Sequence, residues 1–464
     1  MRKGSSLFFS LLFSVSACVA QSAKVYTIDT VVGGAVYDGL PATQTPLNMP
    51  SGLWIDRDGA LWVADAGNQV IRKIDPATGV MRLLVGGGTV IEDSVPVPGA
   101  TVQLNRPSHI VGDTAGNIYF TDSGFNRVRR LTPDGLITTV VGTGEQGFAG
   151  DGRPARLAKL NGPTGLAFDA AGNLFITDRL NCRVRRVDAA GVISTFAGNG
   201  QCGHSGDNGP ALSASLATNV SAEGLAFDSR GNLYISTQVT IRRVDRATGI
   251  ITTVVGIGGA QDCNLIPDGT RATARATCWL GDVVFDPDDN LYFHYNDTLA
   301  KVAAATGLVT NIGGGGTKGL VRDQSGRLIY STYGQVLSVG ASGGVVTVIA
   351  GSTAPFDGPG QFAVLVSPNA LAVDAAGALY IGEGGRIRRF DPATGLVTTV
   401  AGGGSKALAD GVAATTARLT SGVSDLYVDS RGDLLFGQNY CMVWKMDART
   451  GTLRRIAGKD TPYG

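Results

Sequence analysis

The sequence predicts an all-β fold, a β-propeller of eight four-stranded antiparallel units. Short runs rich in β-branched and aromatic residues, at 166–168, 174–177, 184–187 and 192–197, are joined by turns of Gly, Asp and Asn, which is typical of a strand meander. The pattern then repeats along the chain. An Asp closes the first strand of each unit, at Asp56, Asp113, Asp169, Asp228, Asp286, Asp323, Asp374 and Asp429. Because one four-stranded sheet cannot cover both of its faces, we expect the units to stack around an axis.

The turn after the first strand has a physical basis in each unit. Asp169 is suited to accept hydrogen bonds from the backbone N–H groups that follow it, and Gly172 can adopt a positive φ at no steric cost. The spacing of these turns is regular except before the sixth unit, where the Gly-rich stretch 313–319 replaces a long linker. The compressed sixth unit leaves open a smaller ring from which one unit is left out.

Composition and charge exclude several classes of protein. The chain has 464 residues with 67 Gly, 43% hydrophobic and 17% charged residues, and a formal net charge of +1. The hydrophobic content argues against general disorder, and the Gly residues do not follow a three-residue period. A net charge near zero provides no field to attract a polyanion. We therefore expect no nucleic-acid partner, and we expect a monomer.

The N-terminus has the features of an export signal. Arg2 and Lys3 precede an apolar run at 7–13, and small residues follow. The sequence predicts a signal peptide over 1–20. A lipoprotein signal that ends before Cys18 is the alternative, in which Cys18 would be lipidated. We expect an exported protein that is secreted, periplasmic or lipid-anchored at the cell envelope, without a transmembrane segment.

The propeller is predicted to span residues 25–458. Residues 25–34 match a fourth strand such as 136–142, so the chain enters on the last strand of a unit. The last unit has a fourth-strand candidate of its own at 452–458. Which of the two terminal strands closes the ring stays open.

The third strands carry a basic signature, Arg-Arg or Arg-Lys between apolar residues. We expect these side chains to pack along the sheet and to pair with the acidic residues that follow the strand, rather than to form a surface for a polyanion. The expected partners are Asp75, Asp188, Asp245 and Asp391.

The repeats resemble a known family. The runs Gly-Leu-Ala-Phe-Asp-x-x-Gly-Asn-Leu and Asp-x-x-Asn-x-Arg-Val-Arg-Arg-Val are similar to NHL repeats. The linker Gly-Phe-Ala-Gly-Asp-Gly-Arg-Pro-Ala and the strand Ile-Thr-Thr-Val-Val-Gly resemble the bacterial exported branch of the family, which is similar to the teneurin NHL propeller. The resemblance covers 25–458 and is weaker in units five, six and eight. It implies a binding or interaction scaffold and names no ligand.

The cysteines fall on one end of the predicted propeller. We call this end the top face; it comprises the loops between second and third strands and the linkers between units. We expect disulfides Cys182–Cys202 and Cys263–Cys278, as suits an exported protein. Cys441 is then left over, as a thiol or an intermolecular partner.

One histidine is a candidate ligand-binding residue. His109 occupies the start of a first strand, at a place where other units have Gly, and we expect it near the top mouth of the central channel. The sequence has no catalytic motif and no metal-ligand spacing such as His-x-x-x-His. The loops of the type Asp65-x-x-Asn68 have oxygens suited to Ca²⁺, but we expect them to cap their own backbone, so no cofactor is predicted.

These observations predict a non-enzymatic scaffold that binds a protein or a glycan through its top face, where the linkers are long and variable. The alternative is a metal-dependent hydrolase or lyase with its site in the central channel.

Overall fold

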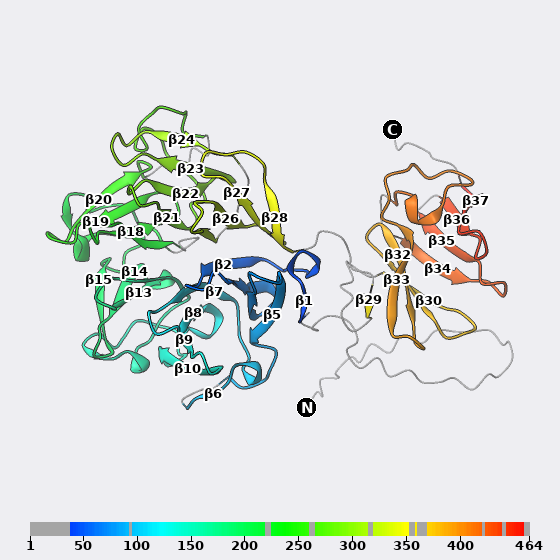
Figure 1. Cartoon of the computed structure of the whole chain (residues 1–464), viewed down its shortest axis with the longest axis horizontal. Helices are drawn as coiled ribbons and strands as arrows, with labels where there is room; N and C mark the ends of the chain where they lie inside the picture. Colours follow the sequence, from blue (N-terminus) through cyan, green and yellow to red (C-terminus); the bar gives the residue numbers. More distant parts are fainter. Residues whose placement is uncertain are drawn as a thin grey trace, which may run out of the picture. The chain divides into compact units, whose positions relative to one another are not determined.

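The computed structural model describes residues 38–91, 95–218, 224–258, 265–313, 319–351, 358–359, 369–419, 423–438 and 442–458. The predicted signal peptide, Cys18 and the strand expected at 25–34 lie outside these residues. Within them the chain forms eight antiparallel sheets, numbered here 1 to 8 in chain order (Figure 1), which confirms the predicted fold class. Each sheet is a meander whose four main strands follow chain order.

The strands recur at equivalent positions in each sheet. The first strands are β2 (Pro50–Ile55), β7 (Pro107–Gly112), β12 (Pro163–Phe168), β17 (Leu225–Phe227), β21 (Val283–Phe285), β25 (Leu320–Arg322), β30 (Ala370–Val373) and β34 (Val423–Val428). The second strands are β3 (Leu61–Asp65), β8 (Ile118–Asp122), β13 (Leu174–Asp178), β18 (Leu233–Ser236), β22 (Leu291–Tyr295), β26 (Leu328–Ser331), β31 (Leu379–Glu383) and β35 (Leu434–Gln438).

The third strands, which carry the basic signature in most sheets, are β4 (Val70–Ile74), β9 (Arg127–Leu131), β14 (Arg183–Val187), β19 (Ile241–Val244), β23 (Thr298–Val302), β27 (Val336–Val339), β32 (Arg386–Asp391) and β36 (Met442–Met446). The fourth strands are β5 (Val80–Val85), β10 (Leu136–Val141), β15 (Val192–Ala197), β20 (Ile250–Val255), β24 (Val309–Asn311), β28 (Thr347–Ala350), β33 (Leu396–Gly402) and β37 (Leu453–Ala457). Sheet 8 therefore has a fourth strand from its own unit.

Within the part of the chain that the structure describes, five sheets gain a short fifth strand that the sequence did not predict. It comes from the preceding linker, ends in Pro and pairs with the fourth strand: β1 (Leu40–Pro41), β6 (Val97–Pro98), β11 (Arg153–Pro154), β16 (Gly209–Pro210) and β29 (Gly358–Pro359). Proline is tolerated there because an edge strand does not need every N–H group. Short 3-10 helices follow in the linkers or lie after second strands: η1 (Ala42–Gln44), η2 (Ala66–Asn68), η3 (Gly99–Thr101), η4 (Ser123–Phe125), η5 (Ala155–Leu157), η6 (Arg179–Asn181), η7 (Ala211–Ser213) and η9 (Ala414–Thr416).

The predicted turn chemistry is confirmed. Oδ1 of Asp169 accepts hydrogen bonds from the N–H groups of Ala171, at 2.9 Å, and Asn173, at 2.8 Å. Gly172 has a φ of 80°, a conformation that a side chain at Cβ would disfavour. Asp56 makes the same bonds to Asp58 and Ala60. The turn between first and second strands is therefore fixed by local sequence.

The first six sheets contact one another in a closed circle. Each of the first strands β2, β7, β12, β17, β21 and β25 contacts the next, and β25 returns to β2. Leu53 and Val63 of sheet 1 share a buried core with Ile329 and Val336 of sheet 6. The hydroxyl of Ser331 also donates to the carbonyl oxygen of Ser51 at 3.3 Å. Sheet 6 thus packs directly on sheet 1.

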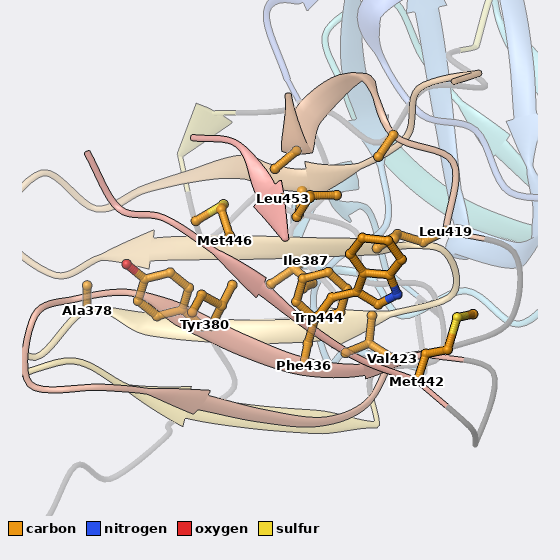
Figure 2. Close-up of a cluster of buried hydrophobic side chains, with 14 residues drawn as sticks. Ala378, Tyr380, Ile387, Leu419, Val423, Phe436, Met442, Trp444, Met446 and Leu453 are labelled. Atoms are coloured by element: carbon orange, nitrogen blue, oxygen red, sulfur yellow. The ribbon is translucent and has the colours of Figure 1, made fainter. Parts of the chain in front are cut away.

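Sheets 7 and 8 share a core of their own (Figure 2). Tyr380 and Ile387 of sheet 7 pack with Phe436 and Trp444 of sheet 8, and their first strands β30 and β34 are in contact. Each sheet thereby covers one apolar face of the other, which is the packing expected for neighbouring propeller units.

Candidate functional site

The top face is assembled by hydrogen bonds between loops and linkers. The N–H groups of Gly67, Gly124 and Leu180, each in the loop after a second strand, donate to linker carbonyl oxygens at 2.8, 2.8 and 3.0 Å, respectively. The acceptors are the carbonyl groups of Asn48, Asn105 and Asn161. The loops and the linkers therefore lie at the same end of the sheets, as the meander predicts.

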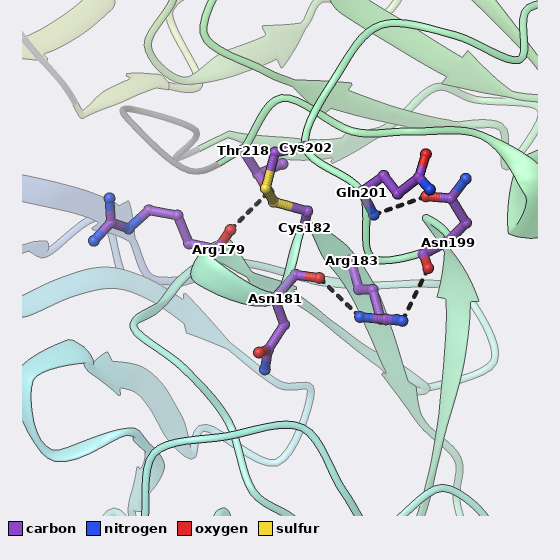
Figure 3. The surroundings of a disulfide bond; sticks show 8 residues. All are labelled: Arg179, Asn181, Cys182, Arg183, Asn199, Gln201, Cys202 and Thr218. Atoms are coloured by element: carbon purple, nitrogen blue, oxygen red, sulfur yellow. Dashed lines mark hydrogen bonds between the residues drawn. A yellow bond between two sulfur atoms is a disulfide. The ribbon is translucent and has the colours of Figure 1, made fainter.

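A disulfide joins one loop of the top face to the next linker (Figure 3). Cys182, at the end of η6, is bonded to Cys202, with 5.3 Å between the Cα atoms. Arg183 links the same two segments, since its guanidinium donates to the carbonyl oxygens of Asn181, at 2.9 Å, and Asn199, at 3.0 Å. Closing a loop of 20 residues stabilises the fold by about 3 kcal/mol in the chain-entropy treatment.

The other cysteine predictions are met only in part by the described residues. Cys278 is disulfide-bonded. Its expected partner Cys263 and the surplus Cys441 lie outside the part of the chain that the structure describes.

His109 lies in the interior of the ring formed by sheets 1 to 6. The residue is the third of β7 in sheet 2 and is 8% exposed. Its Nε2 is 3.1 Å from Oδ1 of Asp282, the residue just before β21 of sheet 5, and its Nδ1 accepts from the N–H of Leu166 at 3.3 Å. Oδ2 of Asp282 accepts from the N–H of Leu320 in sheet 6 at 3.4 Å. One His–Asp pair therefore connects four sheets across the centre.

The hydrogen bonds define what this pair can do chemically. Because Nδ1 of His109 accepts from a backbone N–H, the proton of the neutral ring is on Nε2 and is donated to Asp282. Both ring nitrogens thus have protein partners. Among the described residues, no group of three or more His, Cys, Asp or Glu side chains converges in a way that would hold a metal ion. The arrangement is better suited to linking the sheets by hydrogen bonds than to proton transfer.

Asp282 was not identified from the sequence, although a signal for it was present. The position four residues before the turn Asp is Gly in four of the first six units and is His109 in unit two and Asp282 in unit five. Glycine is required elsewhere because neighbouring first strands approach closely: a Cβ on Gly52 would lie 2.1 Å from the carbonyl oxygen of Ser108. The two departures from Gly are the two residues that meet.

In the basic third strands of sheets 1, 2 and 3 one arginine of the basic pair is buried, and its acidic partner differs from the one predicted. Arg72, Arg129 and Arg185 are fully buried, and each binds the Asp that ends the second strand of its own sheet. The pairs are Arg72–Asp65 at 2.8 Å, Arg129–Asp122 at 2.9 Å and Arg185–Asp178 at 3.2 Å. Glu383 and Arg388 form the equivalent pair in sheet 7.

The prediction of Asp75 and its equivalents as the partners was therefore wrong for the buried arginines. Of these residues, Asp245 and Asp391 bind the outward-facing Arg243 and Arg389, both at 3.1 Å, whereas Asp75 accepts hydrogen bonds from its own turn. The reason is geometric. Side chains alternate between faces along a strand, so only one residue of each basic pair can point toward the following turn.

The Asp-x-x-Asn loops supply the carboxylates of these buried pairs and further hydrogen bonds to them. Asp65 accepts from Arg72, from Nδ2 of Asn68 at 2.8 Å and from the N–H of Asn48 at 2.8 Å. In sheet 2, burial raises the pKa of Asp122 to about 6, an effect that Arg129 opposes. These carboxylates hold the top-face loops to the sheets.

Comparison with known proteins relates the repeats to a known family. Residues 142–203 match the family model of the teneurin NHL domain. The chain is 27% identical to mouse teneurin-3 over 266 residues, which is 53% of this chain and 9% of teneurin-3. It is 33% identical over 159 residues to the chloroplastic protein SUPPRESSOR OF QUENCHING 1 of Arabidopsis thaliana, covering 32% of this chain and 15% of that protein. The chain is an NHL-repeat protein. It spans less than a sixth of the length of either relative.

Solved structures with which the NHL-repeat chain aligns include two enzymes. A virginiamycin B lyase from Staphylococcus aureus is 13% identical, with a TM-score of 0.35 and coverage of 76% of this chain and 94% of that chain. A gluconolactonase from Xanthomonas campestris is 15% identical, with a TM-score of 0.41 and coverage of 63% and 89%. Across the described residues, no helix is long and apolar enough to cross a membrane.

Proposed function

We propose that this NHL-repeat chain is an exported, non-enzymatic scaffold that binds a protein or a glycan through its top face. The observation that carries the proposal is the exposure of large apolar side chains on the loops and linkers of that face. Trp279 is 59% exposed and Tyr333 is 73% exposed, and Met49, Phe148 and Leu180 are exposed as well. Aromatic side chains that remain exposed on a rigid scaffold are typical of interaction surfaces.

The rigidity of the loops supports binding. Met49 and Tyr333 are joined by a backbone hydrogen bond of 2.7 Å, and the Cys182–Cys202 disulfide holds the loop that carries Leu180. A surface whose loops are already ordered loses little entropy when it binds a partner. These side chains are consequently better suited to binding than equally exposed residues in a mobile segment would be.

The centre of the ring gives less support to the alternative of a hydrolase or lyase. Among the described residues no three His, Cys, Asp or Glu side chains converge there, and both nitrogens of His109 are engaged by Asp282 and Leu166. A general acid or base needs an atom directed at its substrate. The scaffold function therefore has the stronger basis.

The proposed location is outside the cytoplasm. The Cys182–Cys202 disulfide supports an oxidising compartment. The signal predicted over 1–20 would deliver the chain there, free after cleavage or held by lipidation of Cys18.

The test compares matched surface variants in binding to native envelope material. Mature protein is incubated with the envelope fraction, crosslinked, and the captured partner is identified by mass spectrometry and then titrated by biolayer interferometry. Trp279→Ala and Tyr333→Ala should each weaken binding of that partner at least tenfold. Ile250→Ala is the control, since Ile250 is exposed on an outer strand, away from the loops. Equal affinity for all three variants would contradict binding through the top face.

A further inference from the structure

Neighbouring sheets are joined by a repeated aromatic contact at the end opposite the top face. The residue just before the turn Asp is Phe in sheets 3, 4 and 5, and its ring meets the aromatic residue in the second strand of the preceding sheet. Three such pairs stand edge to face: Tyr119–Phe168 with ring centroids 5.0 Å apart, Phe175–Phe227 at 5.0 Å and Tyr234–Phe285 at 4.7 Å. The rings fill the space between these sheets.

The contact is missing between sheets 1 and 2. Sheet 1 has the aromatic residue of the second strand, Trp62. In sheet 2, however, Gly112 occupies the position that is Phe in sheets 3, 4 and 5. A crevice of about 580 Å³ lies there, lined by Trp54, Trp62 and Gly112 together with turn residues of both sheets. Its volume is within the range of roughly 300–1,000 Å³ that is typical of small-ligand sites.

Two tryptophans form the apolar part of the crevice. Trp54 and Trp62 are direct cross-strand partners, so both side chains lie on the face of sheet 1 that points to sheet 2. Trp62 is largely buried, whereas Trp54 is partly exposed. The indole N–H of Trp62 donates to Oδ2 of Asp56 at 2.9 Å. Within the described residues, the indole N–H of Trp54 donates to no protein acceptor.

Polar groups surround the two rings. Lys73 lies 3.0 Å from Asp56 and 4.9 Å from the ring centroid of Trp62. Burial alone would raise the pKa of Asp56, but the hydrogen bonds from Trp62 and Lys73 hold this pKa below its ordinary value. Arg57 and Asp58 lie on the rim and are largely exposed. The crevice thus combines aromatic surface with donors and acceptors of both charges.

We propose that the crevice between sheets 1 and 2 binds a saccharide, with a sugar ring seated on Trp54 and its hydroxyl groups bonded by Lys73, Arg57 and Asp58. A pyranose has an apolar C–H face and a rim of hydroxyl groups, and it therefore matches an aromatic ring bordered by charged donors and acceptors. The near balance of the charges favours a neutral sugar over an anion. This site is separate from the top face, so it does not depend on the function proposed above.

The equivalent crevice between sheets 6 and 1 supplies an internal contrast. It has a similar volume of about 630 Å³, but its apolar lining consists of aliphatic residues, among them Ile55, Ile74 and Ile329. Aliphatic side chains offer no ring face for stacking. Cavity size is thus shared by the two crevices, and the tryptophans distinguish the first.

The decisive variant rebuilds the filled arrangement. Trp54→Ala with Gly112→Phe gives the crevice the residues found between sheets 3 and 4, where Ala167 and Phe227 occupy these positions. The replacement of Trp54 is needed because a Cβ on Gly112 would lie 2.8 Å from the indole nitrogen. Arg327→Ala, in the crevice between sheets 6 and 1, is the matched control.

The full chain is titrated calorimetrically with glucose, galactose, mannose, N-acetylglucosamine and their β-1,4 or α-1,4 disaccharides, and tryptophan fluorescence is recorded in parallel. We expect at least one sugar to bind with a millimolar or lower Kd, and the double variant to lose at least tenfold in affinity while Arg327→Ala is unchanged. If the double variant does not fold, the single Trp54→Ala variant gives the same test. The proposal is overturned if none of the sugars binds, or if the Trp54 variants bind as the natural chain does.

Discussion

Sheets 2 and 5 fill equivalent interior positions with different pairs of side chains. In sheet 2, Asp122 ends the second strand and binds Arg129 of the third, and both side chains are fully buried. In sheet 5, Tyr295 and Ala300 occupy these two positions. Tyr295 is also fully buried, and its hydroxyl bonds to Oδ1 of Asn311 at 2.7 Å and to the N–H of Ile266 at 3.0 Å.

The comparison shows that the position requires volume and satisfied polar atoms rather than charge. A long Arg with a short Asp, or a large Tyr with a small Ala, fills the space between one face of the sheet and the linker that covers it. Buried ion pairs are commonly no more stabilising than apolar groups that pack equally well. Removing one member of such a pair is a different matter, because its partner then stays buried without a counter-charge.

The largest effect is expected from Arg129→Ala. The change leaves the carboxylate of Asp122 buried without its cation and opens a cavity, and we expect a loss of about 3–5 kcal/mol in the free energy of unfolding. Urea denaturation followed by circular dichroism measures it. Arg130→Ala is the matched control, since Arg130 is the outward-facing neighbour, and it should cost less than about 1 kcal/mol. Similar losses for the two variants would show that burial of the pair is not what matters.

The second expected effect is a pH dependence of stability that arises from Asp122 of sheet 2. Sheet 5 lacks it, because Tyr295 takes the place of the carboxylate there. Burial raises the pKa of Asp122 to about 6, from its ordinary value of 3.8. A raised pKa means that the folded state favours the protonated form. The stability that protonated Asp122 contributes is therefore fully present below about pH 4. This stability is lost as the pH rises through 6, by about 3 kcal/mol in total.

Asp122→Asn serves to isolate this dependence. The natural chain should lose stability relative to the Asn variant between pH 4 and pH 7, as measured by urea denaturation at both values. A stability difference that does not change with pH would contradict the raised pKa.

A smaller effect is expected from transplanting the arrangement of sheet 5 into sheet 2. Asp122→Tyr combined with Arg129→Ala should recover about 2 kcal/mol relative to Arg129→Ala alone, because no buried charge remains and the ring replaces the lost volume. A double-mutant cycle in urea measures the coupling. A double variant no more stable than the single one would indicate that Asn311 and the linker around Ile266 are indispensable to Tyr295.

Local features of the fold were predictable from the sequence. The turn built on Asp169 and Gly172 depends on residues within four positions of one another, and eight such turns mark the eight sheets. The short fifth strands were missed because a two-residue pairing that ends in Pro, such as Leu40–Pro41, has no strand periodicity.

The partners of the buried arginines were missed for another reason. The prediction paired each arginine with an acid that is close in the chain, whereas the true partner is on the adjacent antiparallel strand. Asp65, Asp122 and Asp178 each lie seven residues before their arginine, and this constant spacing is visible in the sequence. The sequence also supplied His109 as an unusual residue, but its contact with Asp282, 173 residues away, depends on how the sheets close into a ring. No local pattern encodes that distance.

The packing of sheet 6 on sheet 1 has a consequence for the order of folding. Ser331 and Ser51 are 280 residues apart, so the contact between them closes a very long loop. In a chain that emerges N-terminus first, each sheet can form as soon as its own four strands have appeared, because their contacts are local. The junction between sheets 1 and 6 has to wait until about residue 350. Until then the apolar face of sheet 1 that carries Leu53 and Val63 stays uncovered, and this is the face that a chaperone would have to shield.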